Sequence, residues 1–285
     1  MSETSEPFGA CRLSPWRAAI RRIMLQLPDN RLGKHVRSVL RRVMLAGWSG
    51  PVDIDDFCGA RLRLHHADNL ADKYILASGD MYDRAERAAF ATCMEQLWQA
   101  GKQAVFVDLG ANNGSYSLTL AGRAIAAGRP LTVIAIEPDA INRERLAFNV
   151  AATGAGPIVR IDPRAASDVR ERVVMAFNPE NRGGIPAVSA ASGDRDAVDA
   201  LPLLDLLADN GVRADMLKVD IEGRDFTVLE KFLADAAPDQ RPGLIVAEAW
   251  AGERDRMRAL FEGHGYAVRD ISRHNLCAEK ADPPS

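Results

Sequence analysis

Acidic residues follow several apolar segments of this chain of 285 residues, at positions where strands of a parallel sheet would end. Asp108 closes one such segment and is followed by the glycine-containing turn of residues 110–114. A second apolar segment, residues 131–136, ends in Glu137 and Pro138. An acid at the end of a second strand can accept hydrogen bonds from the two hydroxyls of a ribose. The two strand ends therefore predict a site for one nucleotide-like cofactor.

The spacing of the glycines indicates which kind of cofactor this is. Gly110 and Gly114 form G-x-x-x-G, whereas a pyrophosphate requires G-x-G-x-x-G so that backbone amides can approach its charge. Asp108 also places a negative charge beside the turn. A cationic ligand without phosphate fits better, and S-adenosylmethionine combines a sulfonium, an ammonium and a ribose. Two alternatives remain open: the glycines only permit a tight turn, or the chain is a Rossmann oxidoreductase that binds a nicotinamide cofactor.

The segments around these acids alternate between strand and helix patterns. Strands are predicted over 104–108, 131–137, 158–161, 216–220 and 244–248, and helices over 115–127, 140–151 and after each of the last two strands. This βαβ alternation predicts a parallel sheet, which residues 266–271 and 275–279 could close as an antiparallel pair. Ligands of such sheets bind beyond the carboxyl ends of the strands, where the acids lie.

Three further acids at strand ends, Asp220, Glu222 and Glu248, are the candidates for catalysis. Methyl transfer from a sulfonium requires alignment of the acceptor and, for a hydroxyl, removal of a proton. Asp220 is the first candidate for contact with the acceptor or the methionine end of the cofactor, and Glu222 for the base or orienting group. Alternatively these acids cap a loop or a helix. They could also bind Mg²⁺, so the need for a metal stays open.

The composition excludes several classes of protein. A formal net charge of -3 and a pI near 6.0 argue against a nucleic-acid-binding protein with a wholly basic surface. The four cysteines are far apart, which favours reduced thiols in a cytoplasm over a zinc site or disulfides. No apolar segment approaches the roughly 20 residues that span a bilayer, and a secretory signal is lacking. We therefore expect a cytoplasmic protein with one large core.

The first part of the chain differs in charge from the rest. Residues 1–47 hold nine lysines and arginines against three acids, although the whole chain has a net charge of -3. Apolar residues recur at helical spacing on both sides of Pro28, which predicts two basic amphipathic helices within residues 12–47. Such helices either pack on their own domain, or contact a protein partner or the inner membrane surface. A non-catalytic, cofactor-binding protein that works through this surface is therefore another alternative.

The patterns divide the chain into three sections. Residues 1–50 form the basic helical extension, residues 51–103 a hairpin and a helix that lead into the core, and residues 104–285 the catalytic domain. Short alternating segments over residues 52–82 predict the antiparallel hairpin. His65 and His66 are expected at its surface, because no further metal ligand occurs at a recognisable spacing.

Five motifs occur in a characteristic order. They are Val107-Asp108-Leu109-Gly110-Ala111-Asn112-Asn113-Gly114, Ile136-Glu137-Pro138, Leu146-Ala147-Phe148-Asn149, Leu217-Lys218-Val219-Asp220-Ile221-Glu222-Gly223 and Ile245-Val246-Ala247-Glu248. Together they resemble the FkbM family of S-adenosylmethionine-dependent methyltransferases. The resemblance implies an α/β, class I methyltransferase (Rossmann-like) fold, with a mainly parallel seven-stranded sheet, helices on both faces and an antiparallel last strand. It also implies methylation of a hydroxyl, on a sugar or a glycosylated small metabolite.

The predicted cofactor-binding residues follow the first three strands and are Asp108, Gly110, Asn112, Gly114, Glu137, Pro138, Asn142 and Asp162. Asp108 and Gly110 are expected at the methionine portion and Glu137 at the ribose. Asp162 lies where class I enzymes often read the adenine amino group. Asn142 is expected near the ribose, or alternatively on a helix surface.

The sequence also departs from the family pattern in two places. Residues 222–225 read Glu-Gly-Arg-Asp where the family commonly has Glu-Gly-x-Glu. Ala249 and Trp250 follow Glu248 where the family often has a histidine, so no role of that histidine carries over. We expect loops such as residues 178–187 to recognise the molecule that accepts the methyl group.

Overall fold

The centre of the protein is a seven-stranded sheet. The computed structural model describes residues 6–176, 181–191, 193–250 and 252–280. The strand order is β12-β13-β11-β10-β3-β4-β5, in which β13 is antiparallel to both of its neighbours and the other pairs are parallel. The bounds are β3 Ala104–Leu109, β4 Leu131–Ile136, β5 Val159–Asp162, β10 Met216–Val219, β11 Leu244–Glu248, β12 Tyr266–Asp270 and β13 Asn275–Lys280. The predicted fold class is therefore confirmed.

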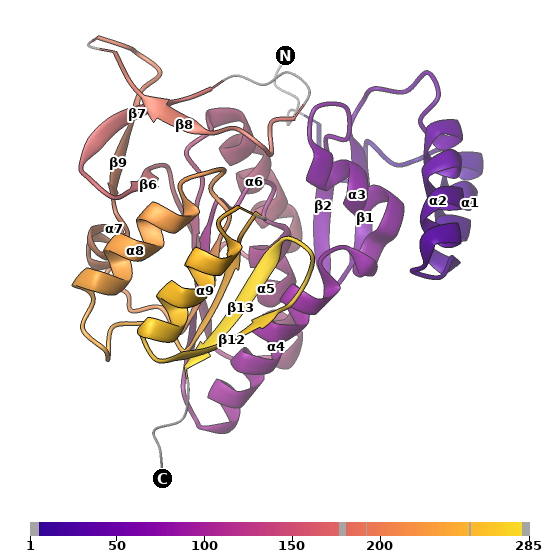
Figure 1. Cartoon of the computed structure of the whole chain (residues 1–285). Coiled ribbons are helices and arrows are strands. Elements are labelled where there is room, and N and C mark those ends of the chain that lie inside the picture. Colours follow the sequence, from indigo (N-terminus) through magenta and orange to yellow (C-terminus); the bar gives the residue numbers. More distant parts are fainter. Residues whose placement is uncertain (1–5, 177–180, 192, 251, 281–285) are drawn as a thin grey trace.

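Helices cover both faces of this sheet (Figure 1). Successive residues of a strand point to opposite faces, and in β3 Phe106 belongs to one core cluster while Val107 belongs to the other. On the Phe106 face lie α4 Arg84–Gln99, α5 Ser115–Ala127 and α6 Ala140–Thr153. On the Val107 face lie α7 Leu203–Asp209, α8 Asp225–Asp235 and α9 Arg254–Gly263. None of the helices in the described ranges is long and apolar enough to cross a bilayer.

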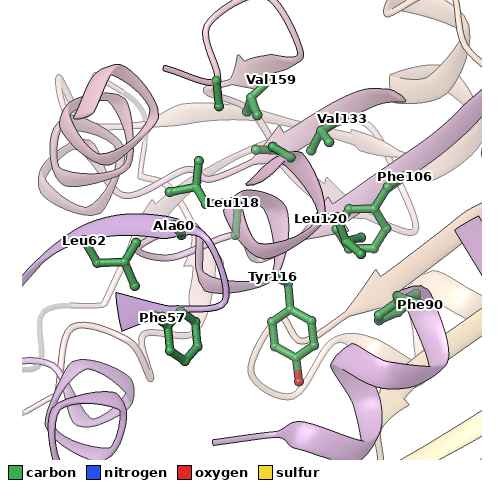
Figure 2. Packing of buried hydrophobic residues seen from close by; sticks show 14 of the residues in the cluster. Phe57, Ala60, Leu62, Phe90, Phe106, Tyr116, Leu118, Leu120, Val133 and Val159 are labelled. Atoms are coloured by element: carbon green, nitrogen blue, oxygen red, sulfur yellow. The ribbon is translucent and has the colours of Figure 1, made fainter. Parts of the chain in front are cut away.

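The elements before the sheet pack into the Phe106 side of the core. They are α1 Pro15–Gln26, α2 Arg31–Met44, β1 Val52–Phe57, β2 Ala60–Leu64, α3 Leu70–Ser78 and the short 3₁₀ helix Gly79–Met81. Figure 2 shows Phe57 and Leu62 of the β1–β2 hairpin beside Tyr116 and Leu118 of α5. The predicted division at residues 50 and 103 stays a prediction, because this core cluster joins residues from all three sections.

A second, smaller sheet lies between β5 and β10 in the chain. Its strands are β6 Ala165–Ser167, β7 Glu171–Met175, β8 Ala187–Ser189 and β9 Val198–Pro202, in the order β6-β9-β7-β8. It stands above α7 and α8 in Figure 1. Arg224, next to α8, binds Glu171 of this sheet with 2.5 Å between Nη1 and Oε1. The sequence patterns did not predict this sheet.

The hairpin and histidine predictions need correction. The antiparallel hairpin ends at Leu64, and residues 70–78 form α3 instead of continuing it. Asn69 caps this helix, since its side chain accepts a hydrogen bond from the amide of Asp72 at 3.3 Å. His65 and His66 are buried between the hairpin and α3, not at the surface.

Candidate active site

A pocket lies beyond the carboxyl ends of β3, β4 and β10. This position is typical of a small-molecule site in an open α/β sheet. Seven of the eleven predicted site residues line it: Gly110, Asn112, Glu137, Pro138, Asn142, Asp220 and Glu222. The other four, Asp108, Gly114, Asp162 and Glu248, lie outside its lining.

The turn after β3 is held close to its two neighbouring strands. The amides of Gly110 and Ala111 both donate to the carbonyl of Ile136, at 3.1 and 3.0 Å. Gly110 has φ +80°, and a Cβ there would lie 1.9 Å from the carbonyl oxygen of Asp220. Gly114 has φ +85° and leaves no room for a side chain against Leu146. Gly110 therefore allows the pocket backbone to approach the turn after β10, and Gly114 allows it to approach the Leu146 side chain.

Glu137 places its carboxylate at the pocket wall. One of its oxygens accepts from the amide of Asn112 at 2.7 Å, and the other from the amide of Asp139 at 3.0 Å. Burial raises its pKa to about 7 in spite of these bonds. Each carboxylate oxygen has two lone pairs, so both can still accept a hydroxyl hydrogen. This arrangement suits the paired hydroxyls of a ribose.

Asp108 lies beneath the turn and pairs with Lys218. Its Oδ2 accepts from the hydroxyl of Ser117 at 2.6 Å, and its Oδ1 is 3.6 Å from the Lys218 ammonium. The same ammonium donates to the carbonyl of Gly110 at 3.1 Å and lies 3.3 Å from Asp220. Lys218 thus connects the floor of the cofactor turn to Asp220 in the adjacent turn, as a buried lysine with two carboxylate partners.

The three predicted catalytic acids gather at the ends of β10 and β11. Asp220 and Glu222 lie in the turn after β10, and Glu222 has the left-handed φ of +54°. Burial and then the charges of Asp220 and Asp225 raise the pKa of Glu222 to about 7. Burial, Asp220 and Glu222 together raise the pKa of Glu248 to about 8. Burial, reinforced by repulsion among like charges, thus produces carboxyl groups that change charge near neutral pH.

Two predicted cofactor residues have different surroundings. Asn142 is buried in the pocket wall, where its Nδ2 donates to the carbonyl of Arg182 at 2.8 Å and its Oδ1 has no partner in the described chain. The alternative of a surface asparagine is therefore wrong. Asp162 turns away from the pocket and is bound by Arg164 through both oxygens and by Asn210. Ala165 and Ala166 occupy the pocket wall at this strand end.

The pocket also contains residues that the sequence patterns did not single out. Arg182 lines it and pairs with Asp68 and Asp139, with Nε 3.4 Å and Nη1 3.5 Å from the respective carboxylates. Tyr82 and Tyr116 also line it, and the Tyr116 hydroxyl donates to Asp83 at 2.9 Å. These residues come from segments far apart in the sequence, so no local spacing signals them. Residues 178–180 of the predicted acceptor loop lie outside the described residues.

These residues fit S-adenosylmethionine better than a metal. Glu137 can accept the ribose hydroxyls, the unpartnered Asn142 Oδ1 can accept a further donor, and Ala165 and Ala166 supply an apolar wall. In the described ranges, no group of three or more His, Cys, Asp or Glu residues could hold a metal ion. The predicted Mg²⁺ alternative therefore receives no support.

The match to a family model agrees with this chemistry. The model of the FkbM methyltransferase domain matches residues 108–268. Among solved structures, an FkbM methyltransferase from Methylobacillus flagellatus aligns at 19% identity with a TM-score of 0.44, over 62% of this chain and 43% of that chain. M. jannaschii TYW2 in complex with AdoMet aligns at 14% identity with a TM-score of 0.40, over 80% and 84%.

A putative caffeoyl-CoA O-methyltransferase from Staphylococcus aureus aligns at 13% identity with a TM-score of 0.39, over 68% of this chain and 83% of that one. No curated protein matched the chain. The family match covers more than half of the chain and contains all of the predicted cofactor-binding and catalytic residues. The chain therefore belongs to the FkbM family of S-adenosylmethionine-dependent methyltransferases.

Proposed function

We propose that the protein methylates a hydroxyl group on a sugar or a glycosylated small metabolite. The observation that carries this proposal is that one pocket joins Glu137, suited to a ribose, to Glu222, an acid that ionises near neutral pH. The family supplies S-adenosylmethionine, whose sulfonium carries an electrophilic methyl group. The remaining requirement for a hydroxyl acceptor is a positioned base.

Glu222 is the base in this proposal. Its pKa of about 7 leaves a substantial fraction ionised at neutral pH while keeping it basic enough to take a proton. Asp220, whose side chain is 43% exposed, orients the acceptor hydroxyl. As the acceptor oxygen forms its bond to the methyl carbon and the carbon–sulfur bond breaks, Glu222 takes the hydroxyl proton. Lys218 balances the negative charge of Asp220 and Asp108 during this step.

An aromatic surface beside the acids supports a carbohydrate as the acceptor. Trp250 follows Glu248, is 55% exposed, and contacts His274 with 4.6 Å between the ring centroids. The carbonyl of His274 accepts from the amide of Ala249 at 2.7 Å, which fixes this contact. The face of an indole can pack against the C–H face of a sugar ring, while carboxylates accept hydroxyl hydrogens.

The test is a methyl-transfer assay over matched hydroxylated and amino acceptors, read by mass spectrometry. We expect transfer to hydroxyls, with a kcat that rises with pH around a midpoint of about 7. Glu222→Gln should lower kcat by about 10²–10⁴ and remove that midpoint without weakening cofactor binding. The matched control is Glu230→Gln on the exposed side of α8.

Four results would contradict the proposal. Transfer only to amines would exclude O-methylation, and an unchanged kcat in Glu222→Gln would exclude this base. Cofactor binding without turnover on any acceptor would favour the non-catalytic alternative. Binding of a nicotinamide cofactor in place of S-adenosylmethionine would favour the oxidoreductase.

The proposal places this reaction in the cytoplasm. All four cysteines, Cys11, Cys58, Cys93 and Cys277, are free thiols. Unpaired cysteines are usual in a reducing compartment. Thiol titration of the protein isolated from cells under alkylating conditions should therefore count four free cysteines.

A further inference from the structure

The two N-terminal helices expose large apolar side chains to solvent. Leu32 is 72% exposed and Trp16 51%, and Ile23, Val39 and Val43 are exposed to a similar extent as Trp16. We call these five residues the N-terminal apolar surface. In Figure 1, α1 and α2 stand at the edge of the molecule, on the far side of the β1–β2 hairpin from the main sheet.

The spacing of these residues separates them from the packed side of each helix. In α2, Leu32, Val39 and Val43 are seven and four residues apart, which places them on one side of the helix. The buried residues of α2, among them Arg37 and Met44, lie on another side. The exposed apolar residues therefore do not contribute to the core.

Basic residues without an acidic partner surround this surface. Arg21 and Arg37 point inward, where Arg21 binds Asp56 at 2.6 Å and Arg37 donates to backbone carbonyls. Arg22, Arg31 and Arg42, in contrast, form no ion pair with any described part of the chain and are exposed. Positive charge and exposed apolar side chains thus occur together on each of the two packed helices.

We propose that this surface docks on an anionic lipid bilayer. A helix that lies in the membrane interface buries its apolar side by about 5–10 Å and keeps its arginines near the anionic head groups. A tryptophan such as Trp16 is favoured at that depth. A second copy of the chain is a poorer occupant, because two surfaces with the same excess of positive charge repel each other.

Docking would also fix the position of the pocket relative to the bilayer. α1 and α2 both pack on α3. Asn69, the N-cap of α3, donates to the Oδ1 of Asn112 in the pocket wall at 2.7 Å. The helices that contact lipid are thus joined to the cofactor turn through a single short helix.

The test is co-sedimentation of the full chain with phosphatidylcholine vesicles, with and without phosphatidylglycerol. We expect binding only to the anionic vesicles, and a loss of binding at about 1 M salt. Arg22→Glu, Arg31→Glu and Arg42→Glu together should weaken binding at least about 100-fold. Leu32→Ser, Val39→Ser and Val43→Ser together should also release the protein.

Matched controls change the same residue types elsewhere on the surface. Arg123→Glu, Arg195→Glu and Arg213→Glu alter the net charge equally, and Ile125→Ser, Val169→Ser and Val188→Ser remove apolar side chains that are 44–53% exposed. Both control triples should bind vesicles like the wild type. Unchanged cofactor binding in every variant, measured by calorimetry, would show that each one folds.

The fluorescence of Trp16 provides an independent readout. Anionic vesicles should shift the emission of the wild type to shorter wavelength, and Trp16→Phe should remove most of that shift. Failure of the wild type to bind anionic vesicles would overturn the proposal. So would a dimer in vesicle-free solution that the Leu32, Val39 and Val43 substitutions dissociate, since that would assign the surface to a second copy.

Discussion

Glu137 and Asp162 are acids of the same predicted class with opposite surroundings. Glu137 accepts two backbone amides and keeps lone pairs directed at the pocket. Asp162 is already saturated by Arg164 and Asn210, outside the pocket lining. A strand-end acid is thus available to a ligand only where no arginine neutralises it. Sequence spacing alone does not distinguish these two cases. It does not show that the chain turns after Asp162 so that Arg164 binds this carboxylate.

The two acids should therefore differ in their effect on cofactor affinity. Glu137→Gln removes a charged acceptor of ribose hydroxyls, each such hydrogen bond being worth about 1.5–3 kcal/mol, so the Kd for S-adenosylhomocysteine should rise by about 10- to 100-fold. Asp162→Asn is the matched control and should leave the Kd within about threefold. Calorimetric titration of both variants measures this. Equal losses of affinity would mean that the pocket does not hold the ribose at Glu137.

The catalytic acids show what local motifs can predict at the scale of a residue. Asp220 and Glu222 were identifiable because they follow an apolar strand, and both line the pocket. The alternation of side chains along a strand does not determine how they point, since β10 ends at Val219 and Glu222 is left-handed. Arg182 could not be predicted, because its partners Asp68 and Asp139 are distant in sequence.

At the scale of the element, two turns define the pocket by pressing against each other. The turn after β3 brings Gly110 against the Asp220 carbonyl, and Asp225 holds the turn after β10 by accepting from the amides of Ile221 and Gly223. The shortened acid at position 225 is therefore a structural residue of this turn. Its contacts are with backbone amides, so a short side chain suffices.

Gly110→Ala should separate the effect of this close approach from simple backbone strain. A positive φ costs a residue other than glycine about 1–3 kcal/mol, and at Gly110 the added methyl would also collide with Asp220. Gly154→Ala is the control, because Gly154 has φ +75° with nothing within 4 Å. Urea denaturation should show a larger loss of unfolding free energy for Gly110→Ala, together with a loss of cofactor binding. Equal losses of unfolding free energy in the two variants would disprove that the close approach of Gly110 to Asp220 stabilises the protein.

The strands of the main sheet were predictable, including the four-residue strands β5 and β10, whereas α3 and the strands of the small sheet were not. β3, α5, β4, α6 and β11 lie within about two residues of their predicted bounds, because their apolar periodicity is sustained. α3 was missed because it has only nine residues, and it follows directly on a hairpin pattern. The strands of the small sheet have three to five residues each and bury little apolar surface, so they have no strong sequence pattern. Their sheet also requires pairing between β6 and β9, which are far apart in the sequence.

At the scale of the whole molecule, the acids fall into two groups with opposite effects on stability. Burial raises the pKa of Glu137 and Glu222 to about 7 and of Glu248 to about 8. In contrast, the hydrogen bond from Arg224 lowers the pKa of Glu171 to about 2. Glu137 and Glu222 line the pocket, Glu248 lies near Glu222 outside the lining, and Glu171 belongs to the small sheet. Ionisation of Glu137, Glu222 and Glu248 therefore lowers the free energy of unfolding. Such shifted pKa values are common at functional sites.

This distribution predicts how the stability of the ligand-free protein depends on pH. Between about pH 4.5 and pH 8 the folded chain keeps protons on Glu137, Glu222 and Glu248 that the unfolded chain releases, so the free energy of unfolding falls as the pH rises. Below that range, protonation of Glu171 removes its stabilising pair, and stability falls again. The melting temperature should thus be highest in weak acid.

Two substitutions assign this pH dependence to the pocket. Glu222→Gln and Glu248→Gln together should reduce the fall of the melting temperature between about pH 5 and pH 8. The free energy of burying a neutral amide is the same at every pH in this range. Glu230→Gln, on the exposed side of α8, should leave the decline unchanged. A melting temperature that rises steadily toward pH 8 in the wild type would mean that these carboxyl groups are ionised without cost, and that Glu222 lacks the elevated basicity that deprotonation of a hydroxyl requires.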